Sequence, residues 1–305
     1  MSTALSSLAD AVAAEGAAAR VRILLHARDL ASGAEVGIDA DEPVVLASVF
    51  KVPVAVELAR RCDSGALDPA LRVRVPAAGR TPGGTGLSAL ADEVELSLRD
   101  LAQLMISVSD NAATDIVMQH VGIDAVNATM RALGLERTVV DRDCATLLGR
   151  LVEDLQLSDA ERTRLEGGDE EVLAELAPER WTTCRDLQPA STNASTPREM
   201  TRLLELVWKD EAGPPAACAF VRRIMGQQVW PHRLRAGFPG SVRTSGKTGT
   251  LPFVRNEVGV VEYPDGGRYA VAVFTVARSA SLQQPDADRV IGRAARLAVD
   301  ALRST

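Results

Sequence analysis

The strongest constraint on the fold is a change in hydrophobic periodicity along the chain. Two short apolar segments, 21–27 and 35–38, lie near the N-terminus with a turn-like sequence between them, which predicts a hairpin. Near the C-terminus, apolar and polar residues alternate over 257–263 and 268–276. The sequence Pro-Asp-Gly-Gly joins these two segments and predicts a second hairpin.

The long segment between these hairpins has a different pattern. From about residue 48 to 207, apolar residues recur at helical spacing. An Ala-rich helix is expected over 4–19 and an amphipathic helix over 286–302.

Strands near both termini around a helical block favour an α+β fold with two domains. Residues 1–43 and 208–305 are expected to form an α/β sandwich with an antiparallel sheet, and residues 44–207 an all-α domain. The active site is expected between the two domains.

Composition narrows the classes of function. A chain of 305 residues with 46% hydrophobic residues can bury one sizeable core or two modest ones. Its net charge of −7 and its scattered Lys and Arg residues argue against a nucleic-acid partner. The four cysteines lie far apart, without the close pairs typical of metal sites, and no metal is expected.

The N-terminal segment and the hydropathy bear on localisation. Asp10 and Glu15 interrupt the N-terminal segment, which lacks the basic region of a signal peptide. No run of eighteen apolar residues predicts a spanning helix, so no membrane partner is expected. The chain as numbered is therefore predicted to be cytoplasmic, or secreted if a leader has been removed. We expect a monomer that acts on a small-molecule substrate.

Three short motifs carry the candidate chemistry, and they follow one another at wide spacing. They are Ser48-Val49-Phe50-Lys51, Ser109-Asp110-Asn111 and Lys247-Thr248-Gly249. A Ser-x-x-Lys match alone is expected about once in a chain of this length, whereas all three in order arise by chance on the order of once in several hundred chains. The combination therefore indicates a shared site.

Ser48 is the candidate nucleophile. At a helix start, the three-residue spacing to Lys51 puts the hydroxyl and the ammonium on one face, so that the lysine can act as the base. The backbone amide of Ser48 can supply one donor of an oxyanion hole. Without the other motifs, a capping serine and a solvated lysine would be the simpler interpretation.

The other two motifs supply groups around this nucleophile. Ser109 can relay a proton to the departing nitrogen, and Asn111 can hold an amide carbonyl and Lys51. Lys247 would bring a second ammonium near Lys51, and two close cations lower each other's pKa. Thr250 would supply the second oxyanion donor, and Gly249 would let the substrate come close to the strand.

The three motifs, together with the sequence segments around them, resemble those of the class A β-lactamases and related penicillin-binding proteins. Ser195-Thr196-Pro197-Arg198-Glu199-Met200 is similar to the family's T-T-P-x-x-M helix start, and 233–239 to its x-I-x-x-G-x-P segment. The resemblance implies acyl-enzyme chemistry without a cofactor. It also implies that a substrate carboxylate meets Lys247, Thr248 and an arginine, for which Arg233 and Arg255 are the candidates.

One departure concerns release of the acyl group. The family's deacylating glutamate lies in an R-W-E-x-x-x-N pattern, but here Arg180-Trp181 is followed by Thr182, and Asp186 stands where the asparagine is expected. Glu179 is the nearest acid in sequence.

Three hypotheses follow, in this order: a β-lactamase, an intracellular serine esterase or peptidase of the same fold, and a β-lactam-binding protein that is acylated without turnover. A Ser-His-Asp triad is not favoured, because there is no Gly-x-Ser-x-Gly elbow and His26, His120 and His232 have no evident serine partner.

Overall fold

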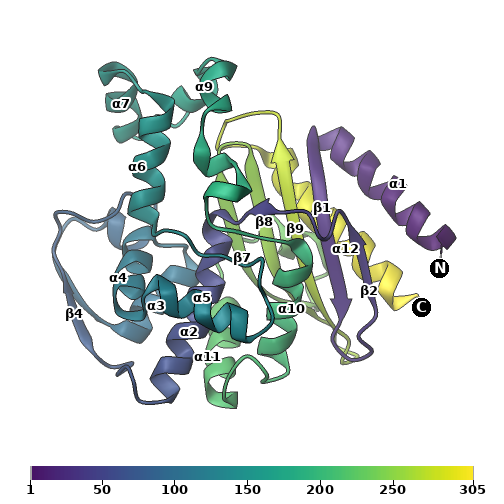
Figure 1. Cartoon of the computed structure of the whole chain (residues 1–305). Coiled ribbons are helices and arrows are strands. Elements are labelled where there is room, and N and C mark those ends of the chain that lie inside the picture. The colour runs from purple at the N-terminus through teal and green to yellow at the C-terminus, as the bar shows by residue number, and fades with distance from the viewer. Residues whose placement is uncertain (1, 305) are drawn as a thin grey trace.

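A five-stranded antiparallel sheet forms the centre of the protein. The computed structural model describes residues 2–304, and its strand order in this sheet is β2-β1-β9-β8-β7 (Figure 1). The strands come from both ends of the chain: β1 (Val21–Asp29), β2 (Glu35–Ile38), β7 (Arg243–Leu251), β8 (Val254–Glu262) and β9 (Arg268–Ala277). Both predicted hairpins are confirmed, because β1 pairs with β2 and β8 with β9 in antiparallel register.

Helices cover both faces of this sheet. The terminal helices α1 (Ser2–Ala19) and α12 (Pro285–Arg303) lie together on one face (Figure 1), over a core that includes Leu25 and Val273. On the other face, α2 (Lys51–Asp63), α10 (Pro197–Trp208) and α11 (Pro215–Met225) belong to the larger core, which includes Leu24 and Phe274. The neighbouring residues Leu24 and Leu25 thus serve opposite faces, as the two-residue period of a strand requires.

The middle of the chain is mostly helical. Its remaining helices are α3 (Leu98–Ser107), α4 (Asn111–Val121), α5 (Ile123–Ala132), α6 (Cys144–Leu155), α7 (Asp159–Glu166), α8 (Val172–Glu175) and α9 (Pro178–Thr182). Short 3₁₀ turns lie at Ala47–Phe50 (η1), Gly86–Ala89, Arg185–Leu187 (η3), Pro189–Ser191 and Leu234–Gly237. These elements and the sheet give the α+β class that the sequence predicts.

The expectation of purely helical structure over 44–207 is corrected by two small sheets. One pairs β3 (Val44–Val45) with β6 (Ala194–Ser195), and the other pairs β4 (Arg72–Val75) with β5 (Val94–Ser97). Strands of two to four residues contain too few repeats to show a two-residue period in the sequence. In addition, α10 packs on β1 and β9 of the large sheet as well as against α11.

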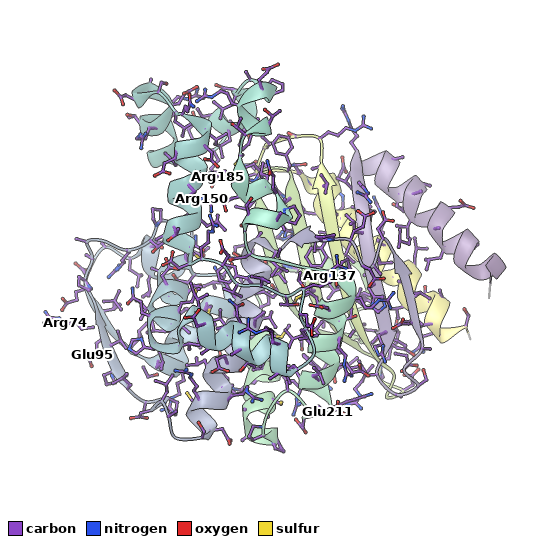
Figure 2. All side chains as sticks on the ribbon, viewed as in Figure 1. Arg74, Glu95, Arg137, Arg150, Arg185 and Glu211 are labelled. Carbon is purple, nitrogen blue, oxygen red and sulfur yellow. The ribbon has the colours of Figure 1, made fainter. Side chains whose placement is uncertain are left out.

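The segment from α6 to α9 extends beyond the rest of the molecule, at the top of Figure 1. Figure 2 labels Arg150 and Arg185 in this region. Arg185 pairs with Asp154 at 2.6 Å and fastens η3 to α6. Among residues 2–304, no helix is both long and apolar enough to cross a membrane.

Candidate active site

Ser48 lies in the tight turn that leads into α2. The residue before it, Ala47, has a φ of +46°, a left-handed conformation that is costly for a residue with a side chain and that is often found at functional sites. Strand β7 lies directly against this turn, since a Cβ atom added to Gly249 would come within 2.5 Å of the carbonyl oxygen of Leu46. Gly249 is therefore needed for packing against the Ser48 turn, and its expected place beside the substrate stays a prediction.

Lys51 begins α2, and its ammonium is held by three oxygen atoms. Nζ donates to the carbonyl oxygen of Ser109 at 2.7 Å, to Oγ of Ser109 at 3.3 Å and to Oδ1 of Asn111 at 2.9 Å. The side chain is fully buried, and burial lowers its pKa from the ordinary lysine value. A buried lysine with a lowered pKa is easier to deprotonate and hence better suited to act as a base.

Ser109 connects the two lysines of the motifs. Its φ of +62° is also left-handed, and its Oγ accepts from Nζ of Lys247 at 2.9 Å. Lys247 is fully buried, and its pKa is lowered strongly, first by burial and then by the charge of Lys51. The structure thus brings one hydroxyl within hydrogen-bonding distance of two buried ammonium groups.

The connector between α3 and α4 explains this orientation. The charge of Asp110 raises the pKa of Lys51, and its carboxylate accepts from the backbone amides of Ala113 and Leu87 at 3.0 Å and 2.6 Å. It thereby caps α4, since the first amides of a helix lack partners within it. With Asp110 fixed, Ser109 and Asn111 on either side of it both reach Lys51.

Strand β7 carries the third motif at the edge of the sheet. Thr248 pairs with Glu257 across β8, and the Thr248 amide donates outward to Oε1 of Gln228 at 2.7 Å. Because amides alternate along a strand, the amide of Thr250 also faces the open edge. The Thr250 side chain is exposed, consistent with a place beside incoming substrate.

The two candidate arginines have different surroundings. Arg233 donates to Oγ1 of Thr250 at 2.8 Å and to the carbonyl oxygen of Gly249 at 3.0 Å, and it pairs with Asp288 at 2.7 Å. Arg255 is fully buried and donates to three carbonyl oxygens, those of Leu251, Val254 and Ser281. Both guanidinium groups are buried and bonded, since Arg233 also donates to the carbonyl oxygen of Asn256 at 2.9 Å. Arg233 is the stronger candidate for the substrate carboxylate because it reaches the side chain of Thr250, which is exposed at the edge of β7.

The residues chosen for deacylation do not lie near Lys51. Glu179 and Thr182 are exposed on α9, where the Thr182 hydroxyl donates to the carbonyl oxygen of Glu179. Trp181 packs among Leu151 and Leu155, about two and three helical turns along α6 from its first residue. The choice of Glu179 and Thr182 is therefore corrected: the Arg-Trp pair serves a satellite core.

Asp186 has a structural environment as well. It is fully buried and lies 3.2 Å from Arg142 and 3.8 Å from Arg150. Burial raises its pKa, and the charge of Arg142 opposes this. Asp186 thus holds the η3 turn against α6 through Arg150, and it pairs with Arg142 just before that helix.

Cys144 interacts with Lys51, and the sequence interpretation did not select it. It is the first residue of α6, is buried, and interacts electrostatically with Lys51. Burial raises the pKa of its thiol to about 12, although the charge of Lys51 lowers it. A signal was present, because Arg142-Asp143-Cys144 has the spacing of the R-W-E pattern with cysteine in the place of glutamate.

Comparison with known proteins places this geometry in context. The model of the beta-lactamase enzyme family matches residues 6–302. The beta-lactamase regulatory protein BlaB of Streptomyces cacaoi is 34% identical over 295 residues, covering 90% of this chain and 91% of that protein.

Two solved structures are also similar. A beta-lactamase from Sphaerobacter thermophilus is 26% identical, with a TM-score of 0.76 and 98% of each chain covered. A mutant of PBP-A, solved as an acyl-enzyme complex with penicillin G, is 20% identical, with a TM-score of 0.75, covering 100% of this chain and 98% of its own. The last likeness concerns the fold alone.

Proposed function

The chain belongs to the beta-lactamase enzyme family, and on this basis we propose that Ser48 is acylated by β-lactams, with opening of the ring. The observation that carries the proposal is the Ser109 hydroxyl between two buried lysines, 3.3 Å from Lys51 Nζ and 2.9 Å from Lys247 Nζ. Such an arrangement can move a proton between a nucleophile and a leaving group without a histidine.

The acylation step uses Lys51 and Ser109 in sequence. Neutral Lys51 takes the proton of the Ser48 hydroxyl as its oxygen bonds to the lactam carbonyl carbon, forming the tetrahedral intermediate. Ser109 then gives its proton to the ring nitrogen as the C–N bond breaks, and Lys51 returns a proton to Ser109. The net result is an ester at Ser48 and an N–H on the opened ring.

Other groups bind the reacting molecule. The amides of Ser48 and Thr250 stabilise the oxyanion. Lys247, Thr248 and Arg233 bind the substrate carboxylate, with the guanidinium held beside the strand by Asp288. Asn111 binds the carbonyl of the substrate side chain and also holds Lys51.

Release of the acyl group is proposed to be slow. Deacylation needs a group that takes a proton from water beside the ester, and a buried thiol with a pKa of about 12 is a poor base at neutral pH. We therefore favour a β-lactam-binding protein with a long-lived acyl-enzyme, and place rapid hydrolysis second. The 34% identity to a protein named as regulatory is compatible with this order.

Intact-mass spectrometry tests the proposal. The protein is mixed with benzylpenicillin and quenched at intervals, while a chromogenic cephalosporin reports hydrolysis. We expect addition of one penicillin mass to the wild type and none to Ser48→Ala. Rapid hydrolysis with no adduct would indicate a β-lactamase, and no reaction with either compound but cleavage of simple esters would indicate an esterase.

A further inference from the structure

A buried glutamate lies behind the substrate-facing edge of β7, and the acylation chemistry does not use it. Glu257 is 2% exposed, and burial raises its pKa above the ordinary carboxyl value. Gly246 makes room for it, because a Cβ atom there would lie 2.6 Å from its Oε1. An acid buried this deeply is costly unless its oxygens are bonded.

Both oxygens of Glu257 accept hydrogen bonds from the segment that precedes β7. Oε2 accepts from the backbone amide of Leu234 at 2.7 Å, and Oε1 from the side-chain nitrogen of Gln228 at 2.6 Å. Gln228 in turn accepts from the Thr248 amide at 2.7 Å. The Glu257 carboxylate on β8 is thus bonded directly to Leu234, the residue after Arg233, and through Gln228 to the backbone of Thr248.

From this geometry we infer that Glu257 and Gln228 are positioning residues, which hold Arg233 and Thr248 in place to bind the substrate carboxylate. The inference rests on the proposed function, because it assigns these residues to recognition of the same β-lactam. Neither residue is bonded to Lys51, so the main effect of changing them is expected on binding. The charge of Glu257 also raises the pKa of Lys247, so Glu257→Gln has to be compared with a variant that keeps the charge in the pair.

The direction of the hydrogen bonds provides a sharp test. The backbone amides of Thr248 and Leu234 are both N–H donors. The two side chains that link them, at positions 228 and 257, must therefore each present an acceptor to its amide. Glu257→Gln introduces an extra N–H group, and no rotation of the two amides then satisfies every bond. In the exchange variant Gln228→Glu/Glu257→Gln, the carboxylate at 228 accepts from both Thr248 and the new amide, and every donor has an acceptor again.

Acylation is measured by intact mass over a range of penicillin concentrations, to separate the apparent binding constant from the limiting rate. We expect Glu257→Gln to raise the apparent binding constant about 10-fold, the scale of one lost buried hydrogen bond, with a nearly unchanged limiting rate. The exchange variant should recover the wild-type constant. Glu262→Gln is the matched control, because Glu262 lies on the same strand but pairs with Arg243 at 3.6 Å.

Penicillin methyl ester provides a second readout. It lacks the anionic carboxylate, so its constants should be the same in the wild type and Glu257→Gln. Thermal unfolding of all variants separates a loss of fold from a loss of positioning. If Glu257→Gln does not fold, the exchange variant is compared with the wild type instead.

The inference is overturned if Glu257→Gln matches Glu262→Gln, if the exchange variant fails to recover, or if penicillin and its ester are affected alike. Absence of any wild-type acylation would instead refute the proposed function, and the inference with it.

Discussion

Replacing Cys144 with glutamate should convert a slow acyl-enzyme into a faster hydrolase. The residue begins α6 beside fully buried Lys51, with Asp143 as the cap of the helix. A carboxylate at a helix start is favoured by the helix dipole and can be held by the neighbouring ammonium. General-base catalysis contributes about 10²–10⁴-fold, which corresponds to roughly 3–5 kcal/mol of the deacylation barrier.

The assay is decay of the penicillin adduct by intact mass after removal of free penicillin. Cys144→Gln is the matched control, because it has the same size as glutamate but cannot take a proton. Overpacking is expected to cost both variants about 1–3 kcal/mol of stability. If Cys144→Glu folds and is acylated at the wild-type rate but its adduct decays no faster than that of Cys144→Gln, the assignment of this position to deacylation is wrong.

Further outcomes are expected for the site and for one buried histidine. Ser48→Ala should abolish covalent labelling, and persistent labelling would exclude Ser48 as the nucleophile. Lys51→Ala should lower the limiting acylation rate, whereas Lys247→Ala should also weaken penicillin binding. In the wild type, the acylation rate should rise with pH as Lys51 loses its proton, with a pKa below the ordinary lysine value of 10.5. Glu179→Gln should leave adduct decay unchanged, and a slower decay would restore Glu179 as a candidate base. Burial lowers the pKa of His26 from 6.5 to about 4, so on acidification the unfolded chain binds a proton at this residue before the folded protein does. The free energy of unfolding, measured with urea, should therefore fall by about 3 kcal/mol as the pH drops from 7 to 4. An equally steep fall in His26→Asn would contradict this.

The predictable parts of the fold are those whose pattern repeats over many residues. The helices near the two ends and the hairpin between β8 and β9 follow from periodicity and turn composition, and their bounds agree within a few residues. The small sheets of β3 with β6 and β4 with β5 depend on tertiary pairing of very short segments, which no local pattern reveals. The division of the chain at residues 43/44 and 207/208 stays a prediction.

The candidate site follows the same distinction. Helical spacing and motif order anticipated that Lys51, Ser109 and Lys247 would meet, and their roles stay predictions that the variants test. The preference for Arg233 over Arg255 needed the structure, because a sequence does not tell which side chain reaches the edge of β7. Both arginines are bonded to backbone carbonyl oxygens, but Arg233 also donates to the exposed Thr250 at that edge.

The deacylation loop shows why a short pattern can mislead. Arg180 and Trp181 match the first two letters of the expected motif, yet Trp181 is 8% exposed and packs edge-on against Phe253, with ring centroids 5.1 Å apart. The packing of Trp181 in its small core is therefore enough to explain the Arg-Trp pair, without any role in deacylation. Under the proposed function, a base for release would be needed beside Lys51, and the start of α6 is a segment that the structure places there. If the base for release belongs at Cys144, acylation and release depend on different parts of the chain, and we expect Cys144→Glu to change the second without disturbing the first.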